Sequence, residues 1–328
     1  MPLSTIYREQ GYVLLEQALP AELIEEHVFR LDEVYRQHGI ESYTALIDRR
    51  SDKTRFQALL RAVQELHNDE PGLQLTMHPG LREPIAEVLQ GDPIRVSALS
   101  QLWGSEATPH ADTSIVWRGP WQTACRAWCA LEDIHPEAGP LFLYPKTHLT
   151  TGDTYRDEVL SADPKFIDVL GELGQGQLRG DEFHLRAKPL FEAARDLIAA
   201  RVADLQRVSF PIRRGDVVVF SFQTIHGGEP IIDKSRRRRA MIMDWHLGST
   251  EDFLMNAYWG ETYDHRCEEN RLEKDPVQVT TLGSYATPDL SVGDELYLRP
   301  VKRCESVGLA TPRAGYERGA PSYPRIRL

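Results

Sequence analysis

Apolar residues recur at helical spacing in the first part of the chain and at strand spacing after residue 93. Segments 20–38, 53–68 and 81–89 carry apolar side chains three and four residues apart, which places them on one face of an α-helix. Residues 5–15 predict a short helix that runs into a strand. These segments contain no grouping of catalytic residue types, so we expect the helices to cover one face of a sheet.

Alternating apolar and polar residues predict β-strands after residue 93. Alternation places successive side chains on opposite faces of a strand. In residues 123–131 it places Cys125, Ala127 and Cys129 on one face and Trp128 on the other. Strands at short, regular intervals are typical of a sandwich or a barrel. The predicted strands are residues 94–103, a strand around His110, and residues 123–131, 141–145, 215–226 and 238–246.

We expect one large domain, because a β-barrel or sandwich commonly reaches about 200 to 250 residues before additions are counted. Helical spacing returns at residues 190–205 and predicts a helical insertion, and insertions on a rigid β scaffold commonly carry binding specificity. The predicted domain spans residues 1–328. It consists of a helical N-terminal support (1–92), a β core (93–248) with an insertion (about 150–208), and an irregular C-terminal extension (249–328) rich in Pro, Gly and charge.

Charge and cysteine content limit the classes of partner. The net charge of −11 argues against nucleic acid or an anionic membrane as a partner, since both require a basic surface, and the basic run of residues 236–239 is too short to reverse this balance. We expect neither a leading signal segment nor a membrane span, because no apolar run in the sequence has the required length. A small-molecule partner and a cytoplasmic location are expected. The sequence is compatible with a homo-oligomer but does not indicate one. Metal-cluster spacing is absent among Cys125, Cys129, Cys267 and Cys304.

The strongest chemical signal is His110 and Asp112, taken together with His226 more than a hundred residues later. In an extended segment, side chains two residues apart project on the same side, so both can reach one metal ion. His226 would supply a third ligand. Two histidines and one carboxylate on one face of an octahedron, with the other face open, form the ligand set of non-haem Fe(II) oxygenases.

The His-x-acid spacing alone does not identify a ligand, because a chain with 11 His shows it by chance. His67 and Asp69 have the same spacing, but they follow a helical pattern in which residues two apart diverge by about 200° around the axis. His135 and Glu137 lie in a turn rich in Pro and Gly, where a solvated polar group is the usual interpretation. His110 and Asp112 differ from these two pairs because they lie in a predicted extended segment, where both side chains project on the same side.

A series of short motifs follows the same order as in a known family. They are Gly11-Tyr12-Val13, His110-Ala111-Asp112, the segment from Trp128 to Asp133, Gly139-Pro140-Leu141, Pro145-Lys146-Thr147-His148, Gly215-Asp216-Val217-Val218, His226-Gly227 and the Arg-rich segment that ends at Ala240. In order and spacing, this series resembles the phytanoyl-CoA dioxygenase family of Fe(II)- and 2-oxoglutarate-dependent oxygenases. Two positions depart from the family pattern: Gly228 stands where relatives often have Ser, and Lys146 replaces a commoner Gly.

The resemblance implies a mainly β fold with flanking helices, in which a double-stranded β-helix, a cupin-like jelly roll, holds the iron inside one end. His110, Asp112 and His226 match the family's iron ligands. Such a triad leaves three positions for 2-oxoglutarate and O₂. The implied reaction converts 2-oxoglutarate to succinate and CO₂ and hydroxylates a C–H bond of a small molecule. Related halogenases have a small residue in place of Asp112, so its carboxylate favours hydroxylation over halogenation.

The resemblance also implies an Arg that binds the far carboxylate of 2-oxoglutarate, on the strand after His226. Its planar guanidinium can donate two parallel hydrogen bonds. Counting from His226 favours Arg237, whereas alignment on Ala240 favours Arg238. Strand alternation lets only one of the two point inward, and we favour Arg238. Trp128 matches an aromatic residue that flanks the co-substrate, although a core indole is the alternative.

Trp117, Arg118 and Trp121 follow the proposed ligands closely enough to line the mouth of the pocket. The two Trp around a Gly-Pro turn would pack on the sheet equally well. If Arg118 faces the pocket, a substrate that bears a carboxylate or phosphate is expected.

Several outcomes stay open from the sequence. The same chemistry would also support desaturation, epoxidation or cyclisation. A jelly roll that binds a metal and a ligand without catalysis is a second class of function, although it needs neither an open coordination face nor an Arg for 2-oxoglutarate. Succinate formation from 2-oxoglutarate separates the two classes.

Overall fold

A computed structural model shows how these segments are arranged. It describes residues 1–112, 124–150, 158–159, 161–166, 169, 185–186, 188–247, 254–256, 262–264, 278–279 and 286–287. Within these residues, no helix combines the length and apolar character needed to cross a lipid bilayer.

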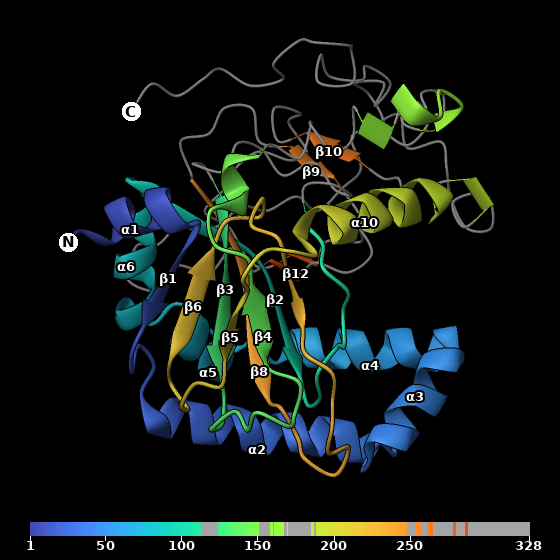
Figure 1. The fold of residues 1–328 in the computed structure, drawn as a ribbon. Helices are drawn as coiled ribbons and strands as arrows, with labels where there is room; N and C mark the ends of the chain where they lie inside the picture. Colours follow the sequence, from blue (N-terminus) through green and yellow to red (C-terminus); the bar gives the residue numbers. More distant parts are fainter. Residues whose placement is uncertain are drawn as a thin grey trace.

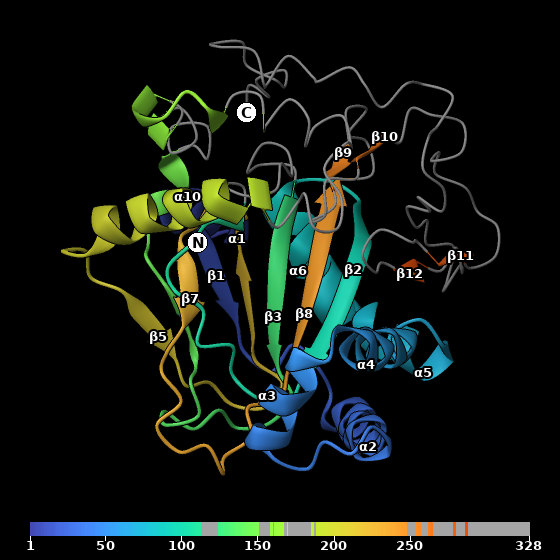
Figure 2. The same ribbon diagram turned by 90° about the vertical axis from the view of Figure 1, so that its right-hand side faces the viewer.

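Two antiparallel sheets form the core, as expected for a jelly roll. The larger sheet has the strand order β1-β6-β3-β8-β2, and the smaller sheet has the order β5-β4-β7. Figure 2 shows the smaller sheet facing the larger one. The strands of the larger sheet are β1 (Tyr12–Leu15), β2 (Pro93–Gln101), β3 (Ala124–Ala130), β6 (Val217–Phe220) and β8 (Ala240–Leu247), and those of the smaller sheet are β4 (Leu141–Leu143), β5 (Val208–Phe210) and β7 (His226–Gly228).

Apolar side chains from both sheets fill the space between them. Trp128 and Phe220 of the larger sheet pack in one cluster with Leu141, Leu143 and Phe210 of the smaller sheet. On the opposite face of β3, Cys125, Ala127 and Cys129 belong to the cluster under the helices. The predicted alternation of β3 is confirmed, and it defines an inner face that opens toward the smaller sheet.

The N-terminal helices cover the outer face of the larger sheet (Figure 1). The helices predicted at residues 20–38, 53–68 and 81–89 are present. Two short helices, α3 and α5, were not predicted, and each follows a residue whose side chain accepts a hydrogen bond from the first turn. The helices are α1 (Leu3–Gln10), α2 (Ala21–Gln37), α3 (Tyr43–Ser51), α4 (Lys53–Glu65), α5 (Glu70–Thr76) and α6 (Pro79–Leu89).

The helix predicted at residues 190–205 is present as α10 (Lys188–Val202). Figures 1 and 2 show it crossing one end of the two sheets. Ile198 and Val202 pack in a cluster with Ala111, Tyr144 and Ile225. Ala111 lies between His110 and Asp112, and Ile225 precedes His226. The insertion therefore contacts the segments that carry the predicted ligands.

The structure defines the predicted strands more closely in two places. The strands predicted over residues 215–226 are β6 and β7, and between them the chain turns at residues 221–225 and crosses from the larger sheet to the smaller one. The strand predicted around His110 is a single β-bridge to His226. Strand β5 was not predicted, because three residues are too few to show alternation.

Short strands also occur in the C-terminal extension. β9 (Leu254–Asn256) pairs with β10 (Thr262–Asp264), and β11 (Gln278–Val279) pairs with β12 (Ala286–Thr287). The division of the chain into one domain with a support, core, insertion and extension stays a prediction.

Candidate metal centre

One β-bridge brings His110 and His226 face to face. The N–H of each residue donates a hydrogen bond to the carbonyl of the other at 2.9 Å. The two imidazole centroids lie 4.4 Å apart. Backbone hydrogen bonds thus fix the relative position of two side chains that are far apart in the sequence, which limits how far the two rings can move apart.

Both imidazole rings adopt the same tautomer. Nδ1 of His110 lies 2.7 Å from the carbonyl oxygen of Thr108, and Nδ1 of His226 lies 2.9 Å from the carbonyl oxygen of Thr224. A carbonyl oxygen can only accept a hydrogen bond, so each Nδ1 carries the hydrogen. Each Nε2 therefore keeps a lone pair, and hydrogen bonds of this kind commonly orient histidines that bind metals.

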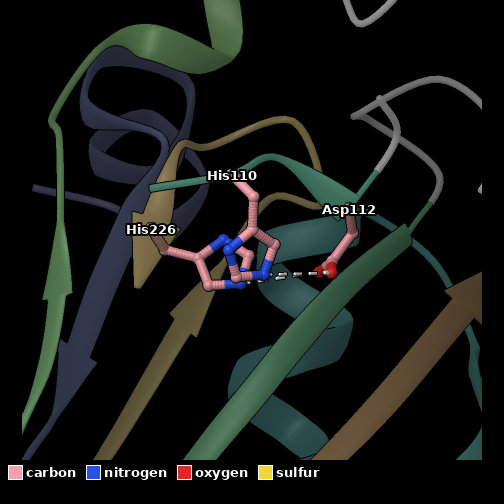
Figure 3. Close-up of side chains that lie close together, drawn as sticks. All are labelled: His110, Asp112 and His226. Carbon is pink, nitrogen blue, oxygen red and sulfur yellow. Dashed lines mark ion pairs between the residues drawn. The ribbon is translucent and has the colours of Figure 1, made fainter. Parts of the chain in front are cut away.

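Asp112 completes the group (Figure 3). Its Oδ1 lies 4.0 Å from Nε2 of His110, and its Oδ2 lies 3.8 Å from Nε2 of His226. One donor atom from each residue can be chosen so that all three lie within 4.8 Å of one another. Donors bound at roughly 2 Å to one ion lie no more than about 4 Å apart, so small side-chain rotations bring all three within reach of one ion.

Burial keeps the two histidines neutral. Burial, with a smaller contribution from neighbouring His110, lowers the pKa of His226 to about 3. Burial also lowers the pKa of His110. Since both rings are neutral at physiological pH, both offer a lone pair, which is the form of histidine that binds a metal.

Gly227 allows strand β7 to pack closely behind the site. A Cβ atom at this position would lie 2.4 Å from Cζ of Phe142 and 2.5 Å from the carbonyl oxygen of Ala107. Any side chain at Gly227 would therefore push β7 away from its neighbours. This explains in physical terms why a glycine follows His226.

Arg238 is a buried cation on the inner face of the larger sheet. It is 3% exposed, and its guanidinium lies over the ring of Trp128 at 5.3 Å. It donates hydrogen bonds to the Gly139 carbonyl (2.9 Å) and to Oε1 of Gln101 (3.3 Å). Burial lowers its pKa to about 10, so it stays charged at neutral pH. Among the described residues, Nε of Arg238 has no hydrogen-bond partner and no carboxylate pairs with its guanidinium. A buried charge without a counterion is costly.

The neighbours of Arg238 point the other way. Arg237 donates to Asp32 of helix α2 at 2.9 Å, and its guanidinium lies 5.8 Å from the ring of Trp103. Arg239 also binds Asp32, together with Glu132. In the segment just before β8, Arg238 therefore points inward and Arg237 points toward the helices.

Arg126 lies beside the proposed ligands, and the sequence did not single it out. Its Nη1 lies 2.7 Å from Oδ2 of Asp112, and its Nε donates to Oδ1 of Asp244 at 2.8 Å. Asp244 is buried and accepts a further hydrogen bond from Ser97 at 2.9 Å. The Arg126 guanidinium also lies 5.3 Å from the ring of Phe222. Asp112 is thus held by an arginine that is itself fixed from the neighbouring strand.

The other predicted positions lie elsewhere. Trp117, Arg118 and Trp121 fall outside the described residues. His67 is buried and shares the hydroxyl of Ser100 with His27. His135 and Glu137 form a half-exposed pair in a turn. In the described part of the chain, one group of three His, Cys or acidic residues has donor atoms close enough together to hold a metal ion. It consists of His110, Asp112 and His226.

Comparison with known proteins places the chain in a family. The model of the phytanoyl-CoA dioxygenase (PhyH) family matches residues 7–240. The chain belongs to this family, whose members are non-haem oxygenases dependent on Fe(II) and 2-oxoglutarate. A search of curated protein sequences finds no significant match.

Solved structures share the fold at low identity. SnoN, a non-haem α-ketoglutarate-dependent epimerase from nogalamycin biosynthesis, aligns with a TM-score of 0.50 at 16% identity, over 78% of this chain and 85% of its own. The apo form of ThoJ, a non-haem monooxygenase, aligns with a TM-score of 0.50 at 13% identity, over 94% of this chain and 92% of its own. Both likenesses support the jelly-roll fold.

The residues present fit the cofactors of the family. Two neutral imidazoles and one carboxylate are suitable donors for Fe(II). The unbalanced charge of buried Arg238 suits a carboxylate such as the far end of 2-oxoglutarate. The residue types present therefore suit both groups.

Proposed function

We propose that this protein is a 2-oxoglutarate-dependent hydroxylase that oxidises a C–H bond of a small organic molecule. The observation that carries the proposal is the convergence of His110, Asp112 and His226 within 4.8 Å, from segments that are far apart in the sequence. The buried, carboxylate-free guanidinium of Arg238 supports it independently, because a jelly roll that only binds a metal does not need that cation.

Each residue has a defined part in this proposal. His110, Asp112 and His226 hold Fe(II), which when bound would supply the oxidising chemistry. Arg238 holds the far carboxylate of 2-oxoglutarate, and Trp128 forms the wall beneath that carboxylate. Arg237, which pairs with Asp32, has no part in this proposal.

Hydroxylation is the outcome that we propose among several. Proteins with this fold include an epimerase and a monooxygenase, so the fold alone does not select the reaction. The carboxylate of Asp112 occupies the position that a halide would need, which favours transfer of oxygen over halogenation. The pocket walls would select the substrate within this class.

A reducing compartment such as the cytoplasm suits the two buried thiols of Cys125 and Cys129, which are free in the described part of the chain. Their side chains lie in the apolar layer between the larger sheet and the helices. We propose a small-molecule substrate and a single domain over residues 1–328.

The test is 2-oxoglutarate turnover. Purified protein is incubated with Fe(II), ascorbate, 2-oxoglutarate and air, with a panel of amino acids, carboxylic acids and neutral metabolites. The expected result is succinate, together with a product heavier by one oxygen atom. His226→Ala should abolish both. Absence of succinate across the panel, together with failure of the protein to retain iron, would contradict the proposal and favour a non-catalytic role.

A further inference from the structure

Helix α10 places one side of the insertion against the proposed metal ligands. Ile198 and Val202 pack with Ala111 and Ile225, which adjoin the three ligands in the chain. Figure 2 shows the helix lying across the end of the two sheets. Residues three and seven apart share one face of a helix. Arg195 precedes Ile198 by three residues and Val202 by seven, so it belongs to the face that contacts the metal end.

Arg195 has no counterion in the described part of the chain. Its Nε is buried and has no hydrogen-bond partner among these residues, and none of their carboxylates forms an ion pair with it. Burying part of a cation without a partner costs free energy unless a ligand compensates.

Other arginines near the site or on the same helix have a carboxylate partner, which Arg195 lacks among the described residues. Arg126 is balanced by Asp112 and Asp244. Arg201, also on α10, pairs with Glu158 at 2.6 Å. Arg238 has a proposed partner in 2-oxoglutarate. Arg195 is therefore a positive charge at the metal end that neither the described protein residues nor the co-substrate neutralises.

We propose that Arg195 binds a carboxylate or phosphate group of the organic substrate. A guanidinium is suited to this task because its planar donors match the oxygens of either anion and because it cannot lose its charge at physiological pH. This inference rests on the proposed function, which it deepens by naming the substrate class. The substrate is then a small organic acid or phosphate ester, with its anionic group held by α10 and the rest of the molecule extending toward the metal ligands.

The test is anion binding by variants, measured by isothermal titration calorimetry without Fe(II) and, under anaerobic conditions, with Fe(II) and 2-oxoglutarate. The probes are phenylacetate, its neutral isostere phenylacetamide, and inorganic phosphate. Wild type is compared with Arg195→Gln, Arg195→Lys and the control Arg201→Gln, whose exposed ion pair lies on the same helix. Thermal unfolding of each variant checks that it is folded.

The expected result is that phenylacetate or phosphate binds wild type and Arg201→Gln alike. Arg195→Gln should bind it at least about tenfold more weakly, because hydrogen bonds to charged groups contribute on the order of 1.5–3 kcal/mol. Arg195→Lys should recover part of the affinity, and phenylacetamide should not distinguish the variants. Any of three results would overturn the inference. Arg195→Gln binds the anions as tightly as wild type, wild type binds phenylacetate and phenylacetamide equally, or wild type binds neither phenylacetate nor phosphate.

Failure of the proposed function has a different signature. In that case wild type forms no succinate and retains no iron, whereas the comparison of Arg195→Gln with wild type in metal-free protein still decides whether Arg195 binds an anion. If wild type forms succinate but Arg195→Gln binds the anions as tightly as wild type, the hydroxylase proposal stands. The proposal that the substrate is an organic acid or a phosphate ester is then rejected.

Discussion

Single residues of the site differ in how they are partnered, and the difference assigns their roles. Arg238 is buried beside Trp128 with carbonyl and amide partners only, whereas Arg237 one residue earlier pairs with a carboxylate of helix α2. A guanidinium with a protein counterion is already neutralised. One without a counterion favours an anionic ligand.

Replacement of Arg238 by Gln should weaken 2-oxoglutarate binding at least about 30-fold, because truncating one partner of a buried, hydrogen-bonded charge pair costs about 2 kcal/mol or more. Iron binding should persist, since Arg238 is not a proposed ligand. Titration of 2-oxoglutarate into the anaerobic Fe(II) protein measures the change. Arg237→Gln is the matched control and should stay within about twofold of wild type. Equal losses in both variants would show that neither residue is specific for the co-substrate.

Arg126 has a separate role, because it lies 2.7 Å from the Asp112 carboxylate and is fixed by Asp244. Groups that orient a metal ligand commonly contribute about 10- to 100-fold to metal affinity. We expect Arg126→Gln to lose Fe(II) affinity by this amount, and Arg126→Lys to lose less. Calorimetric titration of Fe(II) measures the affinity, and the absorption spectrum of the Co(II) form reports the ligand geometry. Unchanged affinity and spectrum in Arg126→Gln would remove this role.

At the scale of elements, the start of strand β1 is locked to the turn that leads into β7. The carbonyl of Gly11 accepts hydrogen bonds from the Ser221 N–H (3.0 Å) and the Thr224 hydroxyl (2.8 Å). Gly11 also ends helix α1 with a φ of 82°, in the left-handed region that favours glycine. The position of His226 therefore depends on a contact made more than two hundred residues earlier in the chain.

Gly11→Ala should destabilise the protein by about 2–5 kcal/mol, from a left-handed non-glycine residue and a steric overlap. The new Cβ would lie 2.5 Å from Nδ1 of His148 and 2.6 Å from the Thr224 hydroxyl. Gly39→Ala is the control, since Gly39 has a φ of 70° but open space around a Cβ, whose nearest neighbour is a flexible Arg49 atom at 3.7 Å. It should lose only about 1–2 kcal/mol. Urea unfolding compares the two, and equal losses would argue against the predicted overlap.

At the scale of the whole molecule, a buried histidine pair joins the helical layer to the larger sheet. Nε2 of His27 on α2 and Nε2 of His67 after α4 both lie 2.9 Å from the hydroxyl of Ser100 on β2. Burial lowers the pKa of His27 to about 4 and that of His67 well below its ordinary value. Arg30 and Arg95 add to these shifts, and Asp69 opposes the shift of His27.

Stability should therefore fall as the solution becomes acidic. Below about pH 6.5 the unfolded chain takes up protons at these histidines that the folded protein does not, so the free energy of unfolding decreases as the pH falls, and the contribution of His27 is lost by about pH 4. For His27 alone the expected loss is about 3 kcal/mol. Urea unfolding at pH 7 and pH 4.5 measures it. His27→Gln should show a smaller loss than wild type, and an equal loss would place the effect elsewhere, for example at His110 and His226.

Local patterns predicted much of the fold and the proposed ligands, whereas long-range pairing decided the rest. His110 and Asp112 are close in sequence, and alternation within β3 could be read directly. The role of Arg126 depends on Asp244, which lies 118 positions away and becomes a neighbour only through the β3–β8 register. The division of residues 215–226 between two sheets likewise depends on contacts with Gly11.

Two further residues have features that could not be predicted from the sequence alone. Lys146 adopts a left-handed backbone with a φ of 67°, a conformation that favours glycine, and the sequence alone did not show this. Arg195 lies in a helix that periodicity predicted, but the position of that helix against the ligand segments depends on the packing of Ile198 and Val202 on Ala111 and Ile225.

The most direct measurement of the central claim is anaerobic titration of Fe(II) into protein that contains 2-oxoglutarate, followed by the charge-transfer absorption of iron chelated by the co-substrate. We predict that the band appears in wild type and saturates at one iron per chain. It should be absent in His226→Ala and in Asp112→Ala. A wild type that shows no band, or a His226→Ala variant that shows the wild-type band at the wild-type iron affinity, would contradict the assignment of His110, Asp112 and His226 as the iron ligands.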